Sequence, residues 1–456
     1  MQRQSAPHSF KQARQVQASS FRRAARYKWP LSITLVLGVT AAFSLSPLVD
    51  VVRPQAPVVG SLRTPFLYDL LAPVSNVLDT LTLLTPAQYW ATFALCLVAL
   101  FAPAVVRTLR HPREFSPLST IAPCLRCIGG TVAIVGLMIV AKRPMAALYL
   151  QDPDLIAVDF HSHTSASHDG RADFSAERNR EWHRSSGFNA AYITDHRTFE
   201  GALTAAERNP AVAGDGMTLL PGVELRDGGE HPILLGADPT RTRLTSADLD
   251  GALIRSDGGA VPPILLLTMP GNIRQVPPSE YTGPIRLAGI EVSDGCPRGM
   301  AQTANEKKDI LALAGRLQLA PVAGSDNHGW GRAAPAWSVL RIPGWRAMTP
   351  ASLDIAIRRT ILARSAGTTE VIARRTAAPA SGRVEAAFGG VTVTMLMLRT
   401  MNLRDRLSWI LWSWAGALGS LVRARNTRRA LRIRVRDSKR NRVPRPLIDA
   451  AAVRVA

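Results

Sequence analysis

The chain has 456 residues, a net charge of +21 and a pI near 11.1, and since single cores rarely grow beyond about 250–300 residues, we expect more than one structural part. Such a basic chain could bind nucleic acid, but residues 150–385 hold 25 Lys and Arg against 27 Asp and Glu. The positive excess therefore lies in the flanks beside apolar segments, where it suits an anionic membrane face, and nucleic-acid binding is not expected.

The N-terminal flank predicts a basic tail followed by a membrane region. Residues 1–28 hold seven Lys or Arg and no acidic residue, which indicates a disordered cytoplasmic tail. Residues 29–150 contain two apolar segments of spanning length, at 29–49 and 89–106. A shorter third candidate at 127–140 would also span if Lys142 and Arg143 extended to the interface. We therefore predict two or three transmembrane helices in a multi-pass protein of the cell membrane, in contact with lipid.

The C-terminal flank predicts a membrane segment over 386–422 and a basic cytoplasmic tail over 423–456. Its apolar stretch at 407–422 carries three tryptophans suited to a membrane interface. Three spans before the central region and one after it would place that region outside the cytoplasm, with both termini inside. Two spans followed by a hairpin would place it in the cytoplasm. The first arrangement is preferred, because Val391 to Thr394 alternate as a strand does.

The central region, 151–380, predicts an α/β domain. Seven short apolar runs alternate with charged stretches that suit helices, a pattern typical of a parallel α/β barrel. The runs are 155–160, 190–194, 218–221, 233–236, 264–268, 289–292 and 320–324.

Imidazoles and carboxylates gather at the ends of these runs, where parallel barrels place their chemistry. Seven of the nine histidines lie between residues 161 and 328. His161 and His163 alternate after the first run, so they would share one face of a strand. The remaining candidates are His196 and Glu224 after the second and third runs, His231 before the fourth, and Asp326 with His328 after the seventh. This mixture of nitrogen and oxygen donors suits Zn, Mn or Fe better than Ca or Mg.

The string D-F-H-S-H-T-x-x-S-H-D-G at 159–170, followed by I-T-D-H, P-G-V-E, H-P-I-L-L-G and G-S-D-N-H, resembles the successive motifs of the polymerase-and-histidinol-phosphatase (PHP) superfamily. Over residues 155–375 this resemblance implies a distorted (β/α)7 barrel, flanked here by transmembrane helices, with two or three divalent metal ions and phosphoesterase activity. It implies that His161 and His163 hold the first metal, Glu224 bridges, His231 holds the second metal and His196 the third, and Asp326 and His328 complete the cluster. His161, His163, Glu224, Asp326 and His328 would form its catalytic part.

Two positions depart from the family pattern. Where the family has Ser-Asp-Gly, this chain has Ser167-His168-Asp169-Gly170, so either His168 or Asp169 could be the ligand. Where the family has a His before Pro, this chain has Met269, whose thioether is a poor ligand for these metals. Asn272 could replace that contact, or one metal could be missing.

Such a cluster would activate water and hydrolyse a small phosphorylated substrate. Arg197, Arg298 and Arg332 follow motif ends and are candidates for holding the phosphate, whereas His183 is interpreted as a packing or surface residue. An alternative is a non-catalytic PHP-like module that senses a metal or ligand at the membrane. The sequence does not indicate an oligomeric state.

Overall fold

The computed structural model describes residues 27–110, 117–140, 143–225, 231–237, 261–268, 286–363, 369–380 and 382–440. The chain divides into two compact units, one formed by residues 40–405 and the other by 1–39 together with 406–456. Residues 1–26 and 441–456 of the two predicted tails, and both Met269 and Asn272, lie outside the described residues, whereas residues 423–440 belong to helix α13.

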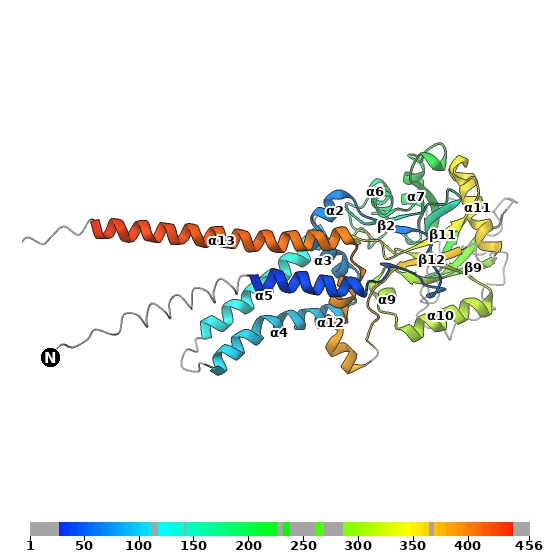
Figure 1. Cartoon of the computed structure of the whole chain (residues 1–456). Helices are drawn as coiled ribbons and strands as arrows, with labels where there is room; N and C mark the ends of the chain where they lie inside the picture. Colours follow the sequence, from blue (N-terminus) through cyan, green and yellow to red (C-terminus); the bar gives the residue numbers. More distant parts are fainter. Residues whose placement is uncertain are drawn as a thin grey trace, which may run out of the picture. The chain divides into compact units, whose positions relative to one another are not determined.

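The larger unit is built on a curled ten-stranded sheet of mixed direction (Figure 1). Its strand order is β1-β12-β11-β4-β5-β6-β7-β8-β9-β10. The bounds are β1 Leu48–Asp50, β4 Leu155–Asp159, β5 Ala190–Ile193, β6 Thr218–Glu224, β7 Ile233–Leu235, β8 Ile264–Leu267, β9 Arg286–Asp294, β10 Ala320–Gly324, β11 Ala336–Arg341 and β12 Thr369–Arg374. A separate pair joins β2 Ser61–Arg63 to β3 Ala147–Tyr149.

All seven predicted apolar runs form strands, β4 to β10, but the prediction of a parallel sheet is wrong in part. β4, β5 and β6 are parallel, as are β8, β9 and β10, whereas β7 is antiparallel to both of its neighbours. Only residues 225–232 connect β6 to β7, and a parallel connection needs about a dozen residues or more. β11, β12 and β1 add antiparallel strands that the run pattern did not predict.

Helices accompany the sheet, as the alternation predicted. They are α6 Ala176–Ser186, α7 Glu200–Ala206, α9 Pro297–Met300, α10 Ala304–Leu317 and α11 Pro350–Ala363. Ser175 caps the N-terminus of α6, and Gly187 ends that helix in the left-handed conformation at φ 86°. Thr303 and Glu306 form a capping box at the start of α10. The strands are buried along nearly their whole length, which explains their continuous apolar runs.

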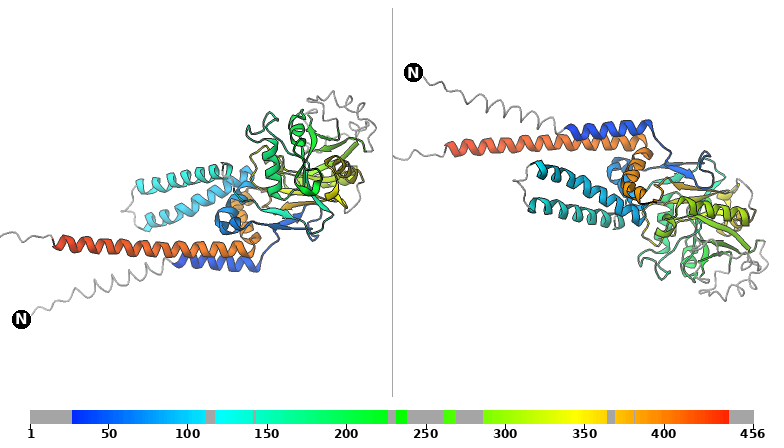
Figure 2. Two further views of the ribbon diagram at one scale, coloured as in Figure 1. Left: turned by 90° about the horizontal axis from the view of Figure 1, so that it is seen from above. Right: turned by 90° about the horizontal axis from the view of Figure 1, so that it is seen from below.

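The larger unit also contains a helical part, α2 Phe66–Leu70, α3 Ala72–Thr82, α4 Pro86–Arg110, α5 Pro117–Val140 and α12 Arg383–Thr400. α4 and α5 lie side by side, and α12 packs against α4 (Figure 2). A Cβ on Gly390 would lie 2.8 Å from the Ala91 carbonyl oxygen, so only glycine permits this approach. The strand interpretation of Val391 to Thr394 is wrong, because these residues lie inside helix α12.

No helix in the part of the chain that the structure describes combines the length and the apolar character needed to cross a membrane. The predicted spans coincide with a helix over residues 27–42, with α4, with α5 and with α13, Leu403–Arg440. In α13 the apolar stretch is short because Arg404 and Arg406 precede it and Arg423 follows it. The described helices thus do not support the predicted transmembrane spans.

The smaller unit pairs the N-terminal helix with α13. The Trp414 Nε1 donates a hydrogen bond to Thr34 Oγ1 at 3.2 Å, and Arg406 Nη1 donates to the Leu37 carbonyl at 2.8 Å. These contacts join residues 380 and 369 positions apart in the sequence.

Candidate metal centre

The C-terminal ends of β4, β5 and β10 are joined by backbone hydrogen bonds. Asp326 N donates to the His161 carbonyl at 2.8 Å, and His163 N donates to the Asn327 carbonyl at 3.2 Å. Thr194 N donates to the Ser162 carbonyl at 2.8 Å, which brings in the end of β5. The sheet curls so that strands distant in sequence deliver their last residues to one place.

Glu224, at the end of β6, lies among four imidazoles. Its Oε2 is 3.1 Å from His161 Nε2, 3.2 Å from His163 Nε2 and 3.3 Å from His196 Nδ1. Its Oε1 is 2.7 Å from His231 Nδ1. The carboxylate therefore occupies the middle of the cluster, the position in which a bridging ligand would lie.

Asp326 brings a second carboxylate to the same imidazoles. Its Oδ1 lies 3.1 Å from His163 Nε2, 3.4 Å from His161 Nε2 and 3.4 Å from His328 Nδ1. The His163 and His328 rings stack with their centroids 3.9 Å apart. Asp326 and His328, which follow β10, thus lie in the same cluster as His161 and His163, which follow β4.

Two residues here adopt the left-handed backbone conformation, Asp326 at φ 45° and Arg197 at φ 55°. Outside glycine this conformation is uncommon, and it persists where the surroundings impose it. The Asp326 N–H is held by His161 O, and the Arg197 N–H donates to Glu224 O at 2.9 Å. The site is thus built on backbone turns that the neighbouring strand ends hold in place.

The structure places both candidates of the Ser167-to-Gly170 motif at the rim. The Asp169 carboxylate reaches two other candidate ligands, with Oδ2 3.3 Å from His196 Nε2 and Oδ1 3.2 Å from His328 Nε2. The His168 side chain is 78% exposed and its Nδ1 lies 3.9 Å from Asp169. His168 still belongs to a possible three-ligand group with Asp169 and His196, but Asp169 is the better connected of the two.

Sequence reasoning missed two acidic residues of the cluster, Glu291 and Asp294 on β9. Glu291 Oε1 lies 3.1 Å from His161 Nδ1, and both carboxyl groups are buried. With His161 they form a further group that could hold a metal ion. The signal was present, since a buried strand ends Glu291-Val292-Ser293-Asp294, but the run was interpreted only as an apolar strand.

A second layer of buried polar residues orients the strand ends. Asp195 accepts hydrogen bonds from Thr164 N at 2.6 Å and Thr164 Oγ1 at 2.8 Å. Asp159 accepts from Ser325 N at 2.9 Å, and its other oxygen lies 2.7 Å from His183 Nε2. His183 is fully buried, so it is the packing residue rather than the surface residue.

The donor atoms fit a metal ion better than they fit one another. His163 Nε2 and His328 Nε2 are buried without a hydrogen-bond partner, although carboxylate oxygens lie within 3.4 Å of both. Several overlapping groups of three or more candidates place their ligand atoms within 4.8 Å of one another. Mixed imidazole and carboxylate donors suit Zn, Mn or Fe.

Burial and neighbouring charges shift the pKa values in opposite directions. Burial opposes the charge on His163, but the nearby Asp326 and Glu224 carboxylates outweigh it and raise the pKa of His163 to about 9. Burial lowers the pKa of His196 to about 4. Despite their burial, the pKa values of Glu224 and Asp326 are lowered, chiefly by the charge of His161. Burial raises the pKa values of Glu291 and Asp294.

The three arginines predicted to hold phosphate lie in different surroundings. Arg197 follows His196 and is half-buried, while Arg298 is exposed on the short helix α9. Arg332 is half-buried and lines a pocket beside α6, with residues that belong to no metal-binding group named above. The structure does not bring the three together.

No protein-family model matches the chain, and no curated protein matches it. Solved structures do. PsfC from Pseudomonas syringae is 16% identical with a TM-score of 0.33, over 54% of this chain and 99% of that one. A two-domain protein from Bacteroides vulgatus, containing a predicted PHP-like metal-dependent phosphoesterase, is 16% identical with a TM-score of 0.33, over 52% and 71%. An amidohydrolase from Chromobacterium violaceum is 16% identical with a TM-score of 0.30, over 49% and 98%. At these values the chemistry must be inferred from the residues of the site.

Proposed function

We propose that this chain is a metal-dependent phosphoesterase of the PHP type, acting on a small phosphate ester. One observation carries the proposal: the Glu224 carboxylate lies 2.7–3.3 Å from four imidazoles, which come from three segments of the chain, two after β4, one after β5 and one before β7. A buried cluster of imidazoles and carboxylates contributes little to the stability of a fold, because apolar side chains would pack there with a smaller desolvation penalty. Metal binding explains why so many such groups share one place.

The residues present would hold two or three divalent ions, with Zn, Mn or Fe preferred by the donor set. Glu224 suits a shared ligand, His161 and His163 suit one ion with Asp326, and His196 and His231 suit others. When bound, such ions lower the pKa of a coordinated water toward about 7 and neutralise charge on a phosphate.

The rest of the chain prepares the site. Asn179 on α6 donates from Nδ2 to the His163 carbonyl at 2.8 Å, and Asp195 holds the Thr164 backbone. Both groups are buried, so the loop that carries the two first histidines is fixed before any substrate arrives. Burial of His163 and Glu224 also keeps bulk water away from the inner side of the cluster.

The substrate side of the proposal is a small phosphorylated molecule. Arg197 lies beside His196 at the rim and is the nearest of the three candidate arginines in sequence to a cluster member. A location at the membrane, with lipid contact, stays a prediction from the basic and apolar flanks.

The test measures metal content and hydrolysis on the full chain. We expect the purified protein to contain more than one equivalent of Zn, Mn or Fe by elemental analysis. It should hydrolyse p-nitrophenyl phosphate or bis(p-nitrophenyl) phosphate, and both properties should disappear in the double variant His161→Ala, His163→Ala. His8→Ala, in the tail far from these motifs, serves as the matched histidine control.

Hydrolysis that survives the double variant would contradict the proposal. A protein that binds the metals stoichiometrically and hydrolyses neither ester, nor a panel of phosphate mono- and diesters, would instead support the non-catalytic sensing module.

A further inference from the structure

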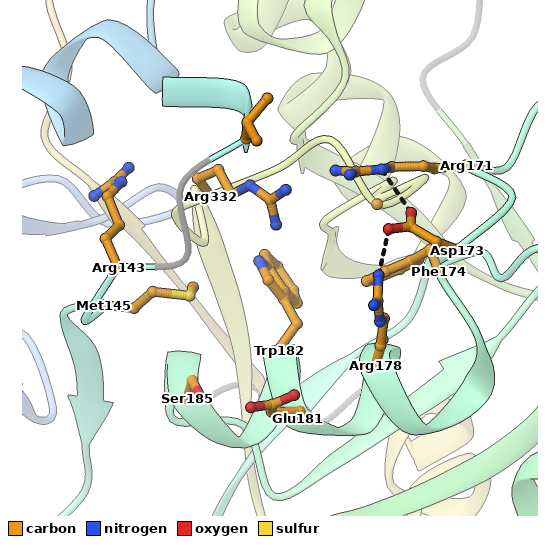
Figure 3. Close-up of a pocket in the computed structure, with 12 residues that line it drawn as sticks. Arg143, Met145, Arg171, Asp173, Phe174, Arg178, Glu181, Trp182, Ser185 and Arg332 are labelled. Atoms are coloured by element: carbon orange, nitrogen blue, oxygen red, sulfur yellow. Dashed lines mark hydrogen bonds and ion pairs between the residues drawn. The ribbon is translucent and has the colours of Figure 1, made fainter. Parts of the chain in front are cut away.

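A pocket of about 270 Å³ lies beside α6, lined by residues outside the metal cluster. Its walls come from the segment around Arg143, the loop of Arg171 and Asp173, helix α6, and the loop of Gly329 and Arg332 (Figure 3). All these residues belong to the larger unit. The volume is just below that of pockets for drug-sized ligands, which begin at roughly 300 Å³, so a smaller ligand suits it.

The charge of this pocket is strongly positive. Four arginines line it, Arg143, Arg171, Arg178 and Arg332, against the acidic Asp173 and Glu181. Asp173 must serve two guanidinium groups, with Arg171 Nε at 2.6 Å from Oδ1 and Arg178 paired to Oδ2. Within the lining, four guanidinium groups therefore face two carboxylates.

Arg143 contributes a buried N–H group that lacks a hydrogen-bond partner. Its side chain is 8% exposed and pairs through Nη1 with Asp79, outside the pocket. Its Nε is buried and has no hydrogen-bond partner. Buried N–H groups without a partner are uncommon and costly.

Trp182 supplies an independent observation. The residue is 6% exposed and lines the pocket, and its indole Nε1 is buried without a hydrogen-bond partner. Figure 3 shows Arg171 and Arg332 extending into the pocket beside the Trp182 ring. Donors that face one small space from several sides suit a tetrahedral oxyanion, because its oxygens accept in several directions, whereas a carboxylate accepts in one plane.

The direction of the pKa shift of Arg332 agrees with this arrangement. Burial lowers its pKa, and the positive charge of Arg171 lowers it further. A bound anion would relieve both effects, since it neutralises the repulsion and accepts hydrogen bonds from the guanidinium groups. Arg171 is also held over the Trp330 ring, with its guanidinium carbon 5.3 Å from the ring centroid.

We propose that this pocket, which we call the arginine pocket, binds a phosphate-type oxyanion with residues other than the candidate metal ligands. Arg171, Arg332 and the Trp182 indole N–H donate to it. The two sites share loops, because Arg171 N donates to the His328 carbonyl at 2.9 Å and Gly329 follows His328 directly. No residue that lines the arginine pocket is a candidate metal ligand, so each site can be tested without the other.

The experiment measures binding of radiolabelled inorganic phosphate to the full chain by equilibrium dialysis, once with Mn²⁺ and once after chelation. We expect binding to persist after chelation, because no residue of the arginine pocket is a candidate ligand. Arg171→Gln and Arg332→Gln should each raise the dissociation constant about tenfold or more, as loss of a charge-assisted bond does. Trp182→Phe, which keeps a ring and removes the N–H, should raise it about fivefold.

Arg184→Gln is the matched control, because Arg184 is an exposed arginine on the same helix and does not line the pocket. It should leave the dissociation constant unchanged. Arg332→Lys keeps the charge and removes the planar fork, so it should weaken binding less than Arg332→Gln does.

Three results would overturn the arginine pocket as a phosphate site. They are loss of phosphate binding on chelation, wild-type affinity in both glutamine variants, or equal weakening by Arg184→Gln. None of these measurements involves hydrolysis, so a failure of the proposed phosphoesterase activity leaves this inference standing, and the reverse holds too.

Discussion

Two buried polar clusters of the larger unit differ in kind, around Asp79 and around Glu224. Asp79 pairs with Arg143 and with Arg374, whose Nη1 lies 2.7 Å from Oδ2, and it accepts from Tyr68 Oη at 2.9 Å. Its partners are permanently charged or purely polar. Glu224 instead meets imidazoles, which can lose their protons and offer lone pairs.

The comparison shows that buried charge alone does not indicate a functional site. Arginine has no acceptor and cannot ligate a metal, so the Asp79 cluster can only join elements, here α3, the segment at Arg143 and β12. The Glu224 cluster could hold cations in place of its protons. Mutation of the Asp79 cluster should therefore lower the stability of the fold, whereas mutation of the Glu224 cluster should lower the affinity for metal.

The largest effect is expected on stability from Asp79→Asn. Removing this carboxylate leaves Arg143 and Arg374 buried without a counter-charge, which costs about 3–5 kcal/mol when one partner of a buried pair is lost. Urea unfolding should show the loss, and metal content of the folded protein should not change. Glu177→Gln, which breaks a half-buried pair with Arg180 near the start of α6, should cost under about 1 kcal/mol. Equal effects of the two changes would remove the distinction.

Glu224→Gln should act on metal binding instead. The amide lacks the negative charge that four imidazoles surround, so we expect metal affinity to fall about a hundredfold or more. Loss of a residue that only hydrogen-bonds to a ligand lowers metal affinity by about tenfold to a hundredfold. Competition with a fluorescent chelator would measure it. Unchanged affinity would mean that the centre of the cluster is not a ligand position.

The pH dependence separates the clusters as well. The pKa of His163 near 9 means that the metal-free protein is protonated there at neutral pH. A metal must displace that proton and the proton on His161, whose pKa is raised well above its usual value by the neighbouring carboxylates, so metal affinity should rise by more than tenfold per pH unit between 7 and 9. His196, with a pKa near 4, is neutral throughout and adds no slope. Calorimetric titration of the protein with metal, in Hepes and in Tris, should show that metal binding releases protons. Metal binding without proton release would contradict the assignment of His163 as a ligand.

The smallest effect is expected from Asp159→Asn, a positioning residue. Asp159 holds Ser325 N and contacts His183 but lies behind the ligands. Metal affinity should fall about tenfold, as for other second-layer partners. The discriminating measurement is the pH slope of metal binding, which should keep its shape. A changed slope would place Asp159 among the ligands.

Much of this architecture could be predicted before the fold was known. The seven apolar runs form β4 to β10, because strands covered on both faces need continuous apolar sequence. The reversal of β7 could also have been predicted, since the connection at 225–232 is too short for a crossover. Glu291 was missed because the run at 289–292 was interpreted only as an apolar strand, and its role becomes clear from the contact with His161 in the folded chain.

The amino-acid sequence by itself determined which donors exist and that most of them follow strand ends, since residue type and alternation are local properties. It also determined the charge division between the central region and its flanks. Only the tertiary structure decided which donors meet, that Asp169 reaches its neighbours better than His168, and that Arg332 belongs to a pocket beside α6. Such contacts join residues distant in the chain, and their geometry comes from how the sheet curls and the loops close, which no local pattern encodes.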